Sequence, residues 1–185
     1  MRLMKQFFLY ILIPFYVFTT DLEIKTPPVF SSLASHHISA VSDLGDSLIL
    51  EDGSVWEISL KHAQTILDWL DIDIIIITQN NSWTSKHNYN FINQRTKETV
   101  STNLIESPLI SSEYFHKIKA IDYFRGEIVL ENNIRWKICS SDIFLVKDWL
   151  LDDGIIVGIN TGWESSFPNI LINVSVNKFV RSKQY

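Results

Sequence analysis

The chain has few of the residues that mark disulfide-rich, flexible or nucleic-acid-binding proteins. Its 185 residues include one cysteine, six glycines and five prolines. A single cysteine, Cys139, excludes an internal disulfide framework and a thiolate zinc cluster, and the low glycine and proline content excludes collagen-like and low-complexity chains. Sixteen Lys and Arg against 21 Asp and Glu give a net charge of −5. This charge argues against a nucleic-acid partner, because phosphate binding requires a basic surface.

The motifs of common enzyme classes are also missing. The sequence contains no G-x-S-x-G nucleophile elbow, no G-x-G-x-x-G and no phosphate loop. Its histidines show no H-x-H or H-E-x-x-H spacing, so we predict no metal and no cofactor. We expect Cys139 to lie at the end of a strand as a small apolar group, because no base stands beside it to activate the thiol.

The N-terminus has the pattern of an export signal. Arg2 and Lys5 precede an uncharged apolar run at 7–18. Twelve helical residues cover roughly 18 Å, less than the ~30 Å of a bilayer core, and Pro14 interrupts the run. We therefore predict a signal peptide at residues 1–20 and a secreted or periplasmic protein. No A-x-A cleavage pattern follows, so an uncleaved membrane anchor through residues 6–18 stays open.

The rest of the chain contains an internal repeat of two copies. Shifted by 80 residues, 28–105 aligns with 108–185 without a gap, and 22 of 78 positions are identical. All six tryptophans take part, with Trp56 on Trp136, Trp69 on Trp149 and Trp83 on Trp163. A repeat of this length suits a small domain, so we predict two tandem domains, repeat 1 (28–105) and repeat 2 (108–185). A domain of this size is marginally stable alone, so we expect the two repeats to share apolar surface across a pseudo-twofold axis.

Each repeat is typical of short antiparallel strands. In repeat 1 we predict strands at 47–51, 54–58, 72–78, 89–93 and 99–105, because alternating or continuous β-branched and aromatic residues end at polar turns. The isoleucine run at 72–78 indicates a strand buried on both faces, with Asp71 and Asp73 as solubilising residues at its start. The segment 61–70, like its counterpart 141–150, is compatible with one or two helical turns or with a loop carrying a 3₁₀ turn. The predicted fold is all-β: two tandem small antiparallel β-barrels, SH3-like or OB-like, each with at most one short helix.

A hairpin turn is the clearest local signal. Asp52-Gly53 separates two alternating segments, and we predict a type I′ turn there, with Asn132-Asn133 in its place in repeat 2. The run Leu50-Glu51-Asp52-Gly53-Ser54-Val55-Trp56 resembles the L-x-D-G-S-x-W hairpin of an uncharacterised group of exported bacterial proteins with small β domains. The resemblance covers most of 36–181, although repeat 2 departs from the motif at Asn132, Asn133 and Ile134. It implies export, a bacterial origin and a β fold, and no assigned activity.

The candidate ligand-binding residues are Trp83 and Trp163, each in a polar loop after a buried strand. An exposed tryptophan there is a platform for a sugar ring or a peptide. The alternative, which agrees better with the other recurring apolar residues, is that each tryptophan folds back to plug an open end of its barrel.

Two other sets of residues recur and could carry chemistry. The carboxylate pairs Asp68/Asp148 and Asp73/Asp153 could meet across a pseudo-twofold and serve a hydrolase, and His36/His116, from equivalent loops, could bind zinc. The simpler interpretation of both sets is structural. We therefore predict an exported, non-enzymatic binding or interaction module of the bacterial envelope, with no catalytic residues, whose partner is a protein or a cell-wall ligand. A hydrolase site between the repeats is the alternative.

Overall fold

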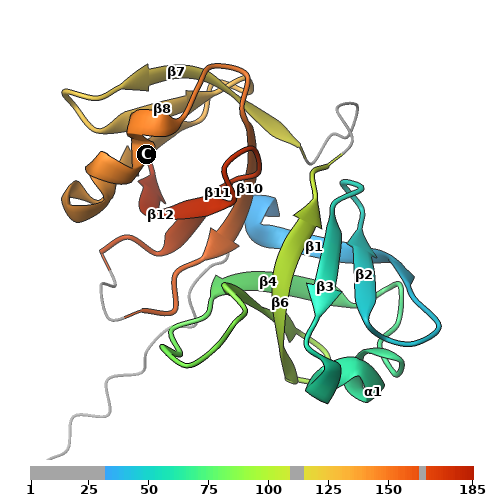
Figure 1. Ribbon diagram of the computed structural model, residues 1–185. Coiled ribbons are helices and arrows are strands. Elements are labelled where there is room, and N and C mark those ends of the chain that lie inside the picture. The colour runs from blue at the N-terminus through green and yellow to red at the C-terminus, as the bar shows by residue number, and fades with distance from the viewer. Residues whose placement is uncertain (1–31, 109–114, 163–165) are drawn as a thin grey trace, which may run out of the picture.

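The computed structural model describes residues 32–108, 115–162 and 166–185 (Figure 1). The predicted signal peptide 1–20, the alternative anchor 6–18 and Trp163 lie outside the described residues. Within the described part of the chain, no helix has the length and apolar character needed to span a bilayer.

Repeat 1 forms a closed six-stranded antiparallel barrel. Its strands are β1 (Ser35–Val41), β2 (Ser47–Leu50), β3 (Val55–Ile58), β4 (Ile74–Gln79), β5 (Tyr89–Asn93) and β6 (Thr99–Glu106). The strands are hydrogen-bonded in the order β1-β2-β3-β6-β5-β4, and β4 pairs with β1 to close the ring.

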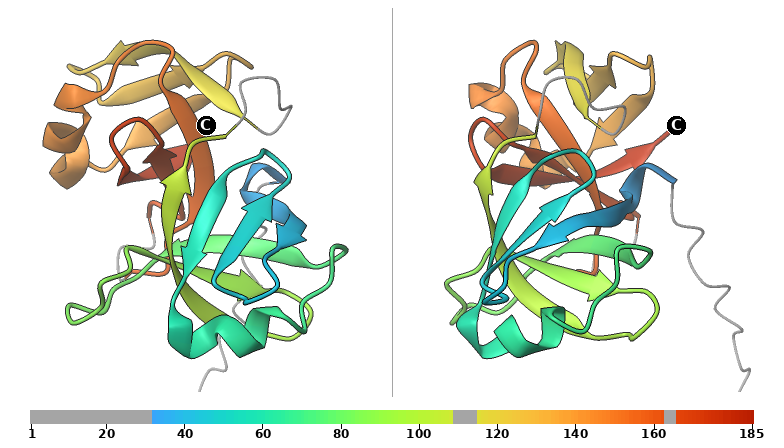
Figure 2. Two further views of the ribbon diagram at one scale, coloured as in Figure 1. Left: turned by 45° about the vertical axis from the view of Figure 1, so that its right-hand side comes forward. Right: turned by 90° about the vertical axis from the view of Figure 1, so that its right-hand side faces the viewer.

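Repeat 2 forms a second closed ring with the same order. Its strands are β7 (His116–Asp122), β8 (Glu127–Leu130), β9 (Arg135–Ile138), β10 (Gly154–Ile159), β11 (Asn169–Asn173) and β12 (Lys178–Gln184). Pairing of β7 with β10 closes it, and the strands β2 to β5 recur in β8 to β11 at an offset of 80 residues. The chain is therefore all-β, two small antiparallel barrels side by side (Figures 1 and 2).

Each barrel has one strand more than we predicted, because the first strand of each repeat escaped detection. In β1 the inward-facing positions are His36 and Ile38, and they alternate with Ser35, His37 and Ser39. A buried histidine interrupts the apolar alternation by which a strand is recognised. His36 and His116 consequently lie in strands, whereas we expected them in loops.

The Asp52-Gly53 hairpin is present, but its turn differs from the predicted type I′. The NH of Gly53 donates to the carbonyl of Leu50, and the NH of Leu50 donates to the carbonyl of Ser54. Only Gly53 has a positive φ, +82°. The connection is thus a three-residue loop that ends in a left-handed residue, the next most common hairpin type. Asn133, with φ +62°, holds the same place in repeat 2.

The segment after each hairpin forms short helical turns. The sequence left this open beside a loop that carries a 3₁₀ turn. Repeat 1 has a 3₁₀ turn, η2 (Leu60–His62), that continues into α1 (Ala63–Ile66). Repeat 2 has the 3₁₀ helix η3 (Ser140–Asp148). A further 3₁₀ turn, η1 (Ser32–Ala34), precedes β1. Cys139 is buried directly after β9, where we expected it.

The two barrels share their cores along β4 and β10. Ile75 and Ile77 of β4 point into the core of repeat 1, whereas Ile76 lies in the core of repeat 2. In β10 the roles reverse, since Ile156 lies in the core of repeat 1 and Ile155 in that of repeat 2. The two strands also pair in parallel at Thr78 and Ile159. The predicted burial of both faces is confirmed, because each face contacts a different core.

Candidate functional site: a groove between the repeats

A groove of about 620 Å³ beside the loop 80–88 is lined by residues of both repeats. This loop connects β4 to β5, and the loop after β10 lies on the same side of the molecule (Figures 1 and 2). We call this feature the junction groove. The residues that line it and matter below are Gln79, Asn80, Asn81, Ser82, His87 and Tyr89 of repeat 1, and Asp142, Asn160, Lys178, Phe179 and Arg181 of repeat 2.

Equivalent asparagines organise the two loops that form the groove. The side-chain oxygen of Asn80 accepts a hydrogen bond from the NH of Ser82 (3.0 Å), and that of Asn160 accepts one from the NH of Gly162 (2.9 Å). Gln79 joins the loops, because its side-chain NH₂ donates to the side-chain oxygen of Asn160. Short polar side chains of this kind replace backbone partners in turns. The two repeats therefore both have asparagine at this position because its side chain holds the loop in shape.

An ion pair forms the wall of the groove on the side of repeat 2. The carboxylate of Asp142 accepts hydrogen bonds from Nε and Nη2 of Arg181 (2.9 and 2.7 Å) and from its backbone NH (2.8 Å). Burial alone would raise the pKa of Asp142, but the bonds from Arg181 outweigh it and hold this pKa below its ordinary value. In repeat 1 the equivalent His62 accepts through Nδ1 from the NH of Ser101 (2.9 Å). His62 and Asp142 thus accept a bond from equivalent backbone NH groups, but only Asp142 is a carboxylate.

The floor of the groove is aromatic. Tyr89 is fully buried, with its ring edge-on to Trp56 at 5.5 Å and to Phe179 at 6.0 Å between centroids. Its hydroxyl donates to the side-chain oxygen of Asn177 (3.3 Å), and burial raises the pKa of this hydroxyl. Tyr89 and Phe179 come from different repeats, so the floor exists only while the two barrels are docked.

Trp83 contradicts the plug interpretation. Its side chain is 95 % exposed, so it fills no part of the barrel. It lies in the loop 80–88 between Ser82 and Ser85, both of which line the junction groove, and its own ring stands outside that lining. An indole left in water on a loop beside a groove is an available contact surface. The prediction that Trp83 and Trp163 bind a ligand remains a prediction.

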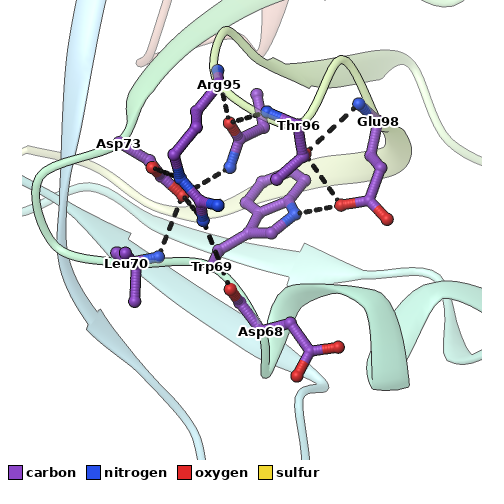
Figure 3. A network of polar contacts seen from close by, with 8 residues as sticks. Asp68, Trp69, Leu70, Asp73, Arg95, Thr96 and Glu98 are labelled. Carbon is purple, nitrogen blue, oxygen red and sulfur yellow. Dashed lines mark hydrogen bonds and ion pairs between the residues drawn. The ribbon is translucent and has the colours of Figure 1, made fainter.

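The recurring carboxylates Asp73 and Asp153 are engaged within their own repeats. Asp73, which we expected at the surface, is only 2 % exposed. It accepts hydrogen bonds from Arg95 Nε (2.5 Å), from the side chain of Asn93 (2.7 Å) and from the NH of Leu70 (2.9 Å) (Figure 3). Its bonds with Arg95 lower the pKa of Asp73 far below its usual range.

Asp153 repeats this arrangement without an arginine. It accepts from the NH of Leu150 and from the side chain of Asn173, both at 2.8 Å. Asp68 and Asp148 lie exposed at the surface. The carboxylates Asp73 and Asp153 therefore anchor the turn before β4 and β10 to the strand β5 or β11.

The histidines His36 and His116 also differ in role. His36, 2 % exposed, contacts Glu51 through Nδ1 and the carbonyl of Val157 in repeat 2 through Nε2, both at 2.9 Å. His116 contacts Asn132 at 3.4 Å. Among residues 32–108, 115–162 and 166–185, no three His, Cys, Asp or Glu side chains are placed to hold a metal ion.

Sequence reasoning missed the asparagines that hold the turns and the residues that line the groove. Asn93 and Asn173 stand at identical positions of the alignment, and their pairing with Asp73 and Asp153 could have been inferred from that double identity. The groove residues Lys178 and Arg181 gave no such signal, because their equivalents Glu98 and Ser101 are different. Comparisons with family models, with curated proteins and with solved structures find no match to this chain.

Proposed function

We propose that this protein is an exported, non-enzymatic binding module of the bacterial envelope, with its ligand site at the junction groove and Trp83 as a contact at its rim. The observation that carries the proposal is the combination of a 620 Å³ groove formed by both repeats and an exposed indole on one of its loops. Binding sites are concave, mix apolar surface with a few polar groups and form preferentially between domains.

The character of the polar groups supports binding more than catalysis. Gln79, Asn80 and Asn160 are amides, and the ion pair of Asp142 with Arg181 is already satisfied. Amides and hydroxyls orient a ligand without transferring protons. The resemblance of the 50–56 hairpin to exported bacterial proteins and the signal pattern at 1–20 make the cell wall the first candidate ligand.

Co-sedimentation with insoluble cell-wall sacculi tests this proposal. The chain from residue 21 onward, which contains every described element, should pellet with the sacculi. Trp83→Ala should weaken binding by about tenfold, as is usual when a tryptophan contact is lost. Phe124→Ala removes another fully exposed aromatic ring, at a site outside the groove, and should leave binding unchanged.

Protein that stays in the supernatant would remove the wall ligand. Equal loss in both variants would remove the assignment to the groove. The export part of the proposal is tested separately by the mass of the native protein, which should correspond to cleavage after Thr20. A mass that includes residues 1–20 would show an uncleaved anchor instead.

A further inference from the structure

The junction groove is positive within an acidic chain. Among the described residues, the charged groups that line the groove are Lys178 and Arg181 against one carboxylate, Asp142, whereas the chain as a whole carries −5. An acidic protein repels anions from most of its surface, so a cationic concavity directs them to one place. The charge of the groove is thus opposite to that of its surroundings.

Lys178 supplies this charge. Arg181 is neutralised by Asp142, its partner in the groove wall. Lys178 is exposed at the start of β12, and its ammonium group has no hydrogen bond or ion pair with the described residues. A flexible lysine without a partner is available to a ligand at no cost in internal contacts.

The equivalent residue in repeat 1 shows that Lys178 has lost a structural role. Glu98 accepts hydrogen bonds from Trp69 Nε1 (2.9 Å) and from Thr96 (2.8 Å). With lysine in its place, the buried Nε1 of Trp149 has no partner among the described residues. An unsatisfied buried donor costs stability, and sites where local structure is sacrificed are often sites of function. The reversal of charge therefore serves the groove and not the fold.

The other groups of the groove suit a polyhydroxylated ligand. Asn81 and Ser82 line the groove and lie exposed next to Trp83 in the sequence, and the half-buried His87 belongs to the same lining. Amides and hydroxyls donate to and accept from sugar hydroxyls, and an indole face stacks on the C–H face of a pyranose. A hydroxyl-rich pyranose ring with an apolar C–H face fits this set better than an extended peptide does.

Building on the proposed binding function, we propose that the junction groove binds an acidic saccharide, with the sugar ring on Trp83 and its carboxylate on Lys178. The recognised group is a sugar carboxylate, as in a uronic acid, which is ionised at neutral pH. The ammonium of Lys178 and the carboxylate would form a charge-assisted hydrogen bond.

Two tetrasaccharides of equal length test the proposal by titration calorimetry on the chain from residue 21 onward. Tetragalacturonate, which carries carboxylates, should bind about tenfold more tightly than neutral tetra-N-acetylglucosamine, since a hydrogen bond to a charged group contributes about that factor. Lys178→Ala should lower the affinity for tetragalacturonate about tenfold and leave that for the neutral sugar unchanged. Lys178→Arg should restore most of it.

Controls separate this site from general charge effects. Lys147→Ala removes an exposed lysine of η3 outside the groove lining and should change neither affinity. Raising the salt to 1 M should weaken only the acidic sugar, because it shortens the screening length to about 3 Å. Unchanged thermal unfolding of the variants would show that each is folded.

The outcomes also distinguish this inference from the proposed function. Equal affinity for the two sugars would overturn the role of Lys178 while leaving a binding module. Tighter binding of tetraglutamate than of tetragalacturonate would replace the saccharide with an acidic peptide and overturn the inference. Absence of binding to all three probes would overturn it as well, and the proposed function would then depend on sedimentation with sacculi alone.

Discussion

His36 is a buried histidine whose two ring nitrogens both face acceptors. The carboxylate of Glu51 lies on one side and the carbonyl of Val157 on the other, so the protonated form of the ring has an acceptor for each of its N–H groups. Burial alone would lower the pKa of His36, but the hydrogen bond and charge of Glu51 raise it above 6.5. Burial would raise the pKa of Glu51, and its bond with His36 lowers it below 4.5. The ion pair lies within repeat 1, and the bond from His36 to the carbonyl of Val157 links this pair to repeat 2.

We therefore predict that His36→Ala lowers the free energy of unfolding by about 3–5 kcal/mol, since it leaves Glu51 without its partner. The raised pKa of His36 gives stability that is complete below pH 6.5 and is lost as the pH rises through the folded value. The lowered pKa of Glu51 gives stability that is complete above pH 4.5 and is lost as the pH falls through the folded value. The difference between wild type and variant should therefore be largest between these values.

Urea unfolding of both proteins at a series of pH values measures this difference. Asp52 and His116 also interact with the charge of His36, and both stay in the variant. His37→Ala is the control, because its backbone NH keeps the bond to Glu51 (2.6 Å). A difference that does not change with pH would show that His36 contributes packing only.

A second prediction at this scale compares the equivalent residues Asp73 and Asp153. Asp73→Asn should cost about 1.5–3 kcal/mol, because Arg95 loses its charged partner at a buried site. Asp153 has no arginine partner among the described residues, so Asp153→Asn should lower the free energy of unfolding by only about 0.5–1.5 kcal/mol. Chemical denaturation of the two variants gives both values, and a larger loss at Asp153 would contradict the anchoring role of Arg95.

At the scale of elements, the hairpin of each repeat shows how a turn can be kept with different residues. Gly53 and Asn133 both have positive φ. Gly53→Ala should cost about 1–2 kcal/mol, because an L-residue with a Cβ is strained there. Asn133→Gly should be neutral or slightly stabilising, because it relieves the same strain. Thermal unfolding of the pair checks this, and tolerance of alanine at Gly53 would exclude a left-handed residue in the turn.

Strands with a regular alternation or a continuous run of β-branched residues were predictable from the sequence, and the first strand of each repeat was not. The predicted strand at 89–93 has the same bounds as β5, because buried aromatic residues alternate there with less buried ones. β1 was missed because its inward position is His36, whose burial depends on Glu51 and on Val157 in the other repeat. A contact between residues 121 positions apart leaves no local pattern.

The junction groove was unpredictable for a related reason. It lies between the repeats, and its cation Lys178 stands where repeat 1 has a glutamate, so the residues that recur in the sequence do not indicate it. What recurs between the repeats, such as Asp73 with Asp153, maintains the fold. What differs between them is where a function specific to the whole molecule can arise. Trp83 is a candidate by its loop position, although the sequence favours the plug, in which its ring would be buried, over the exposed position that it has.

For the whole molecule, Gly158 on β10 marks a tight contact between the barrels. A Cβ there would lie 2.6 Å from the carbonyl oxygen of Ile77 on β4 and 2.9 Å from the side chain of Ile170. Gly158→Ala should therefore push β4 and β10 apart and cost about 1–3 kcal/mol, as overpacking does. Calorimetry gives this value, and unchanged stability would show that the strands can separate without loss.

The exchange of isoleucines between the two cores has a consequence for how the chain can be divided. Heating should give one cooperative transition, with equal calorimetric and van't Hoff enthalpies, since neither barrel keeps its interior alone. Two separate melting steps would contradict this. A half-length fragment would expose the apolar face of β4 that the other repeat normally covers. The surface of most similar shape that could cover it is the same face of a second fragment. Such halves should associate in pairs, which would recover from two short chains the arrangement that the long chain achieves by duplication.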